Sequence, residues 1–152
     1  MTDRTIHVSE VQETVGRWWW NYDEGNFDVL AALLTDDVHF VCRTDTGTTA
    51  FEEFVRADVR GRDDVMNWEI QHRTDSPYPL RHHGTNVHLT AHRADEADFS
   101  SYIHVTHNTA TGVTNLSSAI VNGTARRVGD AVLLSVLEVV LDTRESVLFS
   151  QR

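Results

Sequence analysis

Two groups of residues in this sequence could carry acid–base chemistry: an aspartate at the edge of an apolar helical stripe, and a set of histidines. Asp23 follows Trp19 by four residues and Tyr22 by one, in a segment whose apolar residues recur at helical spacing. A carboxylate beside tryptophans is costly to bury unless it has a partner. Asp23 is therefore a candidate functional carboxylate, and the competing interpretation is a solvated aspartate at a helix end.

The chain holds nine histidines, and six of them fall in two successive Thr/Val-rich segments: His82, His83, His88, His92, His104 and His107. Imidazole titrates near neutral pH, which suits it to general acid–base catalysis. Adjacent antiparallel strands would bring such side chains within reach of one another. Most strand histidines are surface residues, and His88 and His92 fit that simpler interpretation best.

Strand alternation does not decide which of two neighbouring histidines points inward. Leu89 shares a face with His83, and the apolar residues of the next segment share a face with His107. Strict alternation therefore turns His83 and His107 toward the interior. A β-bulge at Gly84 would reverse the alternation and turn His82 inward instead. The pattern alone leaves His82 and His83 as alternatives.

The signatures of several common sites are absent from the sequence. It holds no HExxH or CxxC element, and no GxGxxG, GxxxxGK[ST] or GxSxG motif. Histidine clusters without ligand spacing are weak indications of a metal. We therefore expect no metal and no cofactor.

Trp18, Trp19 and Trp20 span about 200° of a helix, so at least one ring leaves the core stripe; we expect one of them, Trp19, to line a pocket.

Length and charge restrict the class of protein. The 152 residues fit one domain, residues 1–152, and the formal net charge is −10. An acidic chain repels phosphate backbones, so nucleic acid and anionic membranes are poor partners, and a small molecule is the expected ligand. No stretch approaches the ~20 apolar residues of a membrane span. The start of the sequence does not resemble a signal peptide, so the expected location is the cytoplasm.

Along the chain, the predicted helices come first and most of the predicted strands follow them. The helical segments are about residues 9–24, which start after a Ser9 cap and end at Gly25, then 27–34, 51–60 and 62–73, with one strand near 37–44. Beyond Pro79, four long segments predict antiparallel strands: 80–93, 97–109, 114–127 and 131–142. The last is apolar on both faces, which predicts a central strand, with a buried helix as the alternative. This order indicates an α+β fold with a curved, mostly antiparallel sheet that encloses a pocket.

Two stretches, WWWNYDEGNFDVLAALLTDDVHF and RHHGTNVHLT, resemble the SnoaL-like branch of the NTF2-like superfamily. The resemblance implies a cone of N-terminal helices packed on the sheet. Scytalone dehydratases have a Tyr–Asp pair similar to Tyr22–Asp23, and two pocket histidines spaced like His82 and His107. Hexachlorocyclohexane dehydrochlorinases have a stretch similar to His82–Asn86, in which the histidine is a base oriented by an aspartate of the first helix.

These resemblances imply a cofactor-independent dehydratase, isomerase or cyclase acting on a small apolar cyclic or polyketide-like substrate. Asp23 would orient His82 as the base, and His107 or Tyr22 would deliver a proton. The substrate would contact Trp19, His83 and Asn86.

The alternative is non-catalytic. The strand that begins at Arg81 and the Leu141–Asp142 ending are also similar to β-subunits of ring-hydroxylating dioxygenases. That similarity implies a scaffold or a ligand-binding protein. The fold group implies a homo-oligomer in either case, a dimer or a trimer.

Overall fold

The structure is a computed structural model, and it describes residues 5–152. Its helices are α1 (Val8–Glu24), α2 (Phe27–Ala32), α3 (Glu52–Val55) and α4 (Arg62–Thr74). Its strands are β1 (Leu34–Thr44), β2 (Ala57–Arg60), β3 (Leu80–His92), β4 (Glu96–Thr109), β5 (Gly112–Val128) and β6 (Ala131–Leu141), followed by a 3₁₀ turn at Phe149–Gln151. Most of the helical residues precede the long strands, as the sequence predicts.

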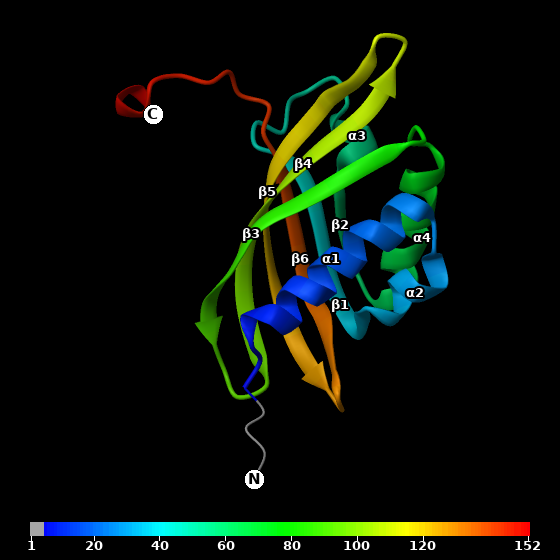
Figure 1. Ribbon diagram of the computed structural model, residues 1–152, viewed down its shortest axis with the longest axis vertical. Helices are drawn as coiled ribbons and strands as arrows, with labels where there is room; N and C mark the ends of the chain where they lie inside the picture. Colours follow the sequence, from blue (N-terminus) through cyan, green and yellow to red (C-terminus); the bar gives the residue numbers. More distant parts are fainter. Residues whose placement is uncertain (1–4) are drawn as a thin grey trace.

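The strands form one six-stranded sheet in the order β2-β1-β6-β5-β4-β3. All neighbours pair antiparallel except β1 and β6, which are parallel. Strand β6 lies between β1 and β5, so the prediction of a central strand for its apolar sequence is confirmed. Figure 1 shows the sheet curving, with α1 crossing one face and α2 and α4 beside it on the same side. The α+β cone is therefore confirmed.

Helix α1 is defined by its ends and by its buried face. The prediction of a Ser9 cap is wrong: the helix begins at Val8 and its N-cap is His7, whose backbone N–H donates to the carboxylate of Glu10 and so fixes the first turn. It ends at Gly25, whose φ of 70° is the left-handed conformation that glycine adopts without strain. Its last two turns bury Trp18, Trp19, Tyr22 and Asp23, of which Trp19 and Tyr22 line the cavity described below.

One predicted helix is partly a strand. Residues 51–60 were expected to be helical throughout, but the helix stops at Val55 and Ala57–Arg60 forms β2. The reason is tertiary: Ala57 pairs with Cys42 and Arg60 with His39, which completes the edge of the sheet beside β1. The helix predicted over 27–34 also ends early, because β1 already begins at Leu34.

Strand β3 contains a bulge that fixes the direction of its histidines. Thr85 pairs with Tyr102 and His88 with Ser100, so two residues of β3, Asn86 and Val87, oppose one residue of β4. Asn86 has a φ of 58°, in the left-handed region. The bulge thus lies just beyond Gly84, where the sequence suggested it, and it reverses the alternation on its N-terminal side.

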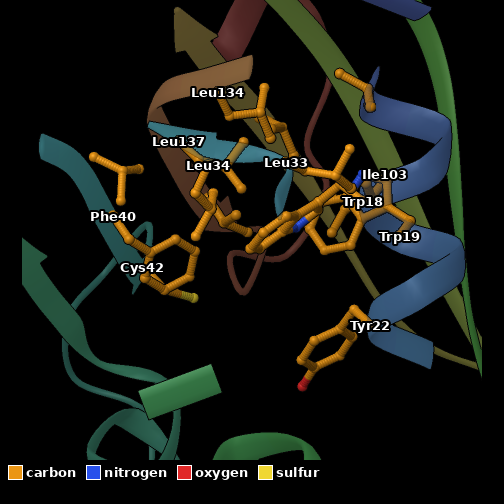
Figure 2. Close-up of a cluster of buried hydrophobic side chains, with 14 of the residues drawn as sticks. Trp18, Trp19, Tyr22, Leu33, Leu34, Phe40, Cys42, Ile103, Leu134 and Leu137 are labelled. Carbon is orange, nitrogen blue, oxygen red and sulfur yellow. The ribbon is translucent and has the colours of Figure 1, made fainter. Parts of the chain in front are cut away.

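The core fills the space between α1 and the sheet. Figure 2 shows Trp18 and Trp19 projecting from α1 toward Leu33 and Leu34, with Phe40 and Cys42 facing them from β1. Trp18 is fully buried, whereas Trp20 is 68% exposed, so the tryptophan run divides between core and surface.

Among residues 5–152, every helix is too short or too polar to cross a lipid bilayer.

Candidate functional site

A partly open, apolar cavity of about 150 Å³ lies between the helices and the concave face of the sheet. Aromatic and aliphatic side chains form most of its wall: Trp19, Tyr22, Phe40, Phe54, Val55, Trp68, Leu80, Ile103, Val105, Leu116, Val139 and Leu141. Its polar and ionisable lining is small: Cys42, Glu69, His72, Ser76, Ser117 and His82. A large apolar wall with few polar groups is typical of a small-molecule site.

Asp23 and His82 meet at the edge of this cavity. Oδ1 of Asp23 lies 2.6 Å from Nδ1 of His82, and the backbone N–H of His82 donates to Oδ2 of Asp23 over 2.8 Å. Asp23 is 4% exposed, so one residue satisfies both oxygens of a buried carboxylate. A carboxylate can only accept, so Nδ1 of His82 carries the hydrogen and Nε2 is the acceptor. Nε2 has no hydrogen-bond partner in the described part of the chain.

Two rings of α1 fix the plane of the His82 imidazole. Trp19 stacks on it with 4.8 Å between ring centroids and 8° between planes, and Tyr22 meets it edge-on at 5.3 Å. Gly84 makes this stack possible: a Cβ at Gly84 would lie 3.1 Å from Cδ1 of Trp19. The ring therefore has one orientation, set by a carboxylate on one nitrogen and by aromatic faces around it.

Arg73 fixes the end of α1 that carries Asp23. Its Nε and Nη2 donate to the backbone carbonyl of Asp23 over 3.1 and 2.9 Å, and its Nη1 donates to the carbonyl of Pro77 over 3.1 Å. A cation at a helix C-terminus also interacts favourably with the helix dipole. The guanidinium thus joins α1, the end of α4 and the approach to β3, which are the three segments that position the Asp23–His82 pair.

A second polar pair lies in the cavity wall. The Tyr22 hydroxyl is 2.6 Å from Nδ1 of His72, whose ring stacks on Trp68 and Phe54 with 4.5 Å between centroids in both cases. Burial lowers the pKa of His72 to about 4 and raises the pKa of Tyr22. At neutral pH, His72 is an uncharged imidazole held by an uncharged phenol.

Glu69 is the buried acid of the cavity. It is 3% exposed, and no described residue from 5 to 152 donates a hydrogen bond to its carboxyl group. Burial raises its pKa to about 8. Sequence reasoning missed both Glu69 and His72. A signal was present for Glu69, because it lies four residues after Val65 and three after Met66, on the buried stripe of α4.

The other predicted site residues lie away from the cavity wall. His83 is exposed on the opposite face of the sheet, where Nε2 lies 3.0 Å from the Thr106 hydroxyl. Asn86 is exposed in the bulge, and its carbonyl lies 3.0 Å from Nδ1 of His88. His107 pairs with Leu80 across β3 and β4, but it is not among the residues that line the cavity.

The described residues offer no metal centre: no group of three or more His, Cys, Asp and Glu side chains within residues 5–152 is arranged to hold an ion.

Comparisons with solved structures agree on the fold. A candidate scytalone dehydratase from Novosphingobium aromaticivorans is 14% identical, with a TM-score of 0.71 over 89% of this chain and 83% of that one. The β subunit of a candidate aromatic-ring-hydroxylating dioxygenase from the same organism is 13% identical, with a TM-score of 0.71 over 90% of both chains. A Catenulispora acidiphila protein in complex with S-DNPA is 23% identical, with a TM-score of 0.69 over 88% and 91%.

No functionally curated protein matches the sequence significantly. A family model does: the SnoaL-like domain matches residues 3–133, which is most of the chain. This match confirms the resemblance that the two sequence stretches indicated. The chain also shares the NTF2-like fold of its structural neighbours. The chain belongs to the family of SnoaL-like domains.

Proposed function

We propose that this protein is a cofactor-independent acid–base enzyme, a dehydratase, isomerase or cyclase, which acts on a small, largely apolar cyclic substrate. One observation carries the proposal: a buried carboxylate holds Nδ1 of His82, while Nε2, on the other side of the ring, is an acceptor that no residue from 5 to 152 engages, in a side chain that lines an apolar cavity. The likeness to a candidate dehydratase agrees with this choice, although at 14% identity it shows the fold alone.

His82 acts as the general base in this proposal. Nε2 removes a proton from a carbon next to a carbonyl group, and the imidazolium that forms donates through Nδ1 to Asp23. The carboxylate of Asp23 stabilises that cation and holds the ring in the productive tautomer. The apolar wall excludes water, which strengthens each of these few polar contacts.

The proton donor for the departing or developing oxygen has two candidates from the sequence, and their positions differ. Tyr22 lines the cavity, but its hydroxyl is engaged with Nδ1 of His72. His107 lies on the next strand and outside the cavity wall, so it requires a bridging water. Position therefore favours Tyr22 over His107 for this role, and Trp19 has the role of holding His82 and contacting the ligand.

The test measures carbon-acid chemistry directly. Cyclic ketones and cyclic β-hydroxyketones are incubated with the protein in D₂O, and exchange of hydrogen next to the carbonyl is followed by NMR, with enone formation followed by absorbance. We expect His82→Ala and Asp23→Asn to lower the rate by roughly 100-fold or more, the typical contribution of a positioned base. His83→Ala is the matched control, because His83 is the adjacent residue on the opposite face of β3, and it should keep the wild-type rate.

Wild-type rates in both His82→Ala and Asp23→Asn would contradict the proposal. A protein that binds these ketones but catalyses neither exchange nor elimination would favour the non-catalytic alternative, in which the cavity only holds a ligand.

A further inference from the structure

Glu69 has an acidic side chain that the proposed base chemistry does not use. It projects from α4 into the same cavity as His82, and it is 3% exposed. Its carboxyl group receives no hydrogen bond from any residue of the described chain. A carboxyl group in a residue that is 3% exposed has lost most of its hydration, and no described residue replaces that hydration with a hydrogen bond. Such a group in a cavity wall therefore points to a ligand that would supply the missing partner.

The surroundings of Glu69 keep it uncharged. Tyr22 of α1 and Cys42 of β1 are near enough to interact with its charge, and His72 of its own helix and His82 of β3 line the same cavity. Strand β6 contributes only apolar side chains, and among residues 5–152 no lysine or arginine lines the cavity. Burial without a cation raises the pKa of Glu69 to about 8. At neutral pH the group is a carboxylic acid, which can donate a hydrogen bond.

We propose that Glu69 donates a hydrogen bond to the carbonyl oxygen of an uncharged, one-ring ligand, while His82 faces the carbon next to that carbonyl. The inference rests on the proposed function for the role of His82, but the contact between Glu69 and the oxygen does not need catalysis. A protonated carboxylic acid that acts as a donor in an apolar site is a known way to stabilise an enolate.

Cavity size and charge define the ligand class. A void of about 150 Å³ is the size of an engineered apolar cavity that binds benzene, so one ring of about six atoms fits. A ligand with a carboxylate or phosphate in the cavity would find no lysine or arginine among the described lining residues, and it would meet the negative charge of Asp23. Neutral cyclic ketones are therefore favoured over anionic ligands.

The two groups together complete an elimination of water. The C–H proton moves to Nε2 of His82, its electron pair forms the enolate, and the negative oxygen is held by the O–H of Glu69. The carbonyl then re-forms, the electron pair makes the new carbon–carbon double bond, and the β-hydroxyl leaves as water with the proton from Nε2, which the Tyr22 hydroxyl relays. His82 and Glu69 end in the protonation states in which they began.

The test uses binding rather than turnover. Cyclohexanone and methylcyclohexane are titrated into the wild type, Glu69→Gln and Glu69→Met, with tryptophan fluorescence as the signal, because Trp19 and Trp68 line the cavity. We expect Glu69→Met to weaken cyclohexanone binding about tenfold, the value of one hydrogen bond, and to leave methylcyclohexane binding unchanged. Glu69→Gln keeps a donor and should retain most of the affinity.

Two further measurements identify the donor. The carbonyl stretch of bound cyclohexanone should shift to lower frequency in the wild type and should not shift in Glu69→Met. Wild-type affinity for the ketone should fall as the pH rises through about 8, whereas the affinity of Glu69→Gln should not change over that range.

The inference is overturned if Glu69→Met binds cyclohexanone as tightly as the wild type does, if affinity rises with pH through 8, or if the wild type binds neither ring. His82→Ala should preserve the preference for the ketone. A failure of the base mechanism would appear in the exchange rates of the His82 and Asp23 variants, so the two failures are separable.

Discussion

Two ionisable side chains in the cavity wall are pushed in opposite directions by the same cause. Burial raises the pKa of Glu69 to about 8 and lowers the pKa of His72 to about 4. Both shifts favour the neutral form, because a low-dielectric site penalises charge of either sign. The negative charge in contact with His82 is that of Asp23, which both the ring and the backbone N–H of His82 satisfy. The wall thus presents uncharged donors and acceptors to a ligand.

Tyr22→Phe tests the hydroxyl contact with His72. The variant leaves Nδ1 of a buried, neutral imidazole without a partner, so we expect a loss of about 1–3 kcal/mol in the free energy of unfolding, measured by urea denaturation. The rate of hydrogen exchange separates two roles. A change of less than threefold would assign Tyr22 to positioning, whereas a drop comparable with that of His82→Ala would assign it to proton delivery.

At the scale of elements, the last turns of α1 and the start of β3 work as one unit. Trp19 and Asp23 lie four residues apart on one face of α1, and both contact His82 of β3. The closeness of the two elements depends on Gly84, which leaves room for the Trp19 ring.

Gly84→Ala should therefore reduce activity. The added methyl group would sit 3.1 Å from Cδ1 of Trp19, so the indole must shift relative to the imidazole on which it stacks. We expect a fall of about tenfold or more in exchange rate, since small displacements of a catalytic group have large effects on rate. Gly16→Ala in α1, the helix that carries Trp19, is the control: a Cβ there meets nothing within 4 Å. It should keep the rate and raise stability by about 0.5–1 kcal/mol. Equal rates in both variants would remove Gly84 from this role.

The sequence predicted elements whose signals are local, and it missed those that depend on pairing. Helix α1 and the long strands carry their own periodicity, so their positions were predicted within a few residues. Residues 57–60 were misassigned because only β1 makes them a strand.

The same limit applied to the site. Periodicity favoured His83, because a bulge appears only when the pairing of β3 with β4 is known, and the family resemblance favoured His82. Glu69 was passed over because an acid on a helix is usually solvated.

At the scale of the whole molecule, the raised pKa of Glu69 and the lowered pKa of His72 predict how the free energy of unfolding depends on pH. Between pH 6.5 and 8, folded Glu69 retains a proton that the unfolded chain has lost, so stability falls as the pH rises. Between about 4.5 and 6.5, His72 acts in the opposite direction, because the unfolded chain binds the proton that folded His72 rejects.

Glu69→Gln isolates the acid from all other titrating groups. The stability difference between the variant and the wild type should increase from pH 4.5 to 8 by up to about 1.4 kcal/mol per pH unit, and it should be constant above that. Chemical denaturation over a series of pH values measures this difference. A difference that does not change with pH would mean that Glu69 is ionised in the folded protein.

The number of residues in the bulge of β3 decides which histidine, His82 or His83, faces the cavity. Because Asn86 and Val87 share one partner position, removal of one of them would restore strict alternation between Leu80 and Leu89. If the part of the strand anchored by Leu89 kept its place, His83 would then turn inward and His82 outward. Deletion of one residue would thus turn every side chain of β3 on the N-terminal side of the deletion to the opposite face of the sheet. In this strand a single-residue gap changes which side chain is presented to the cavity, even though both candidates are histidines.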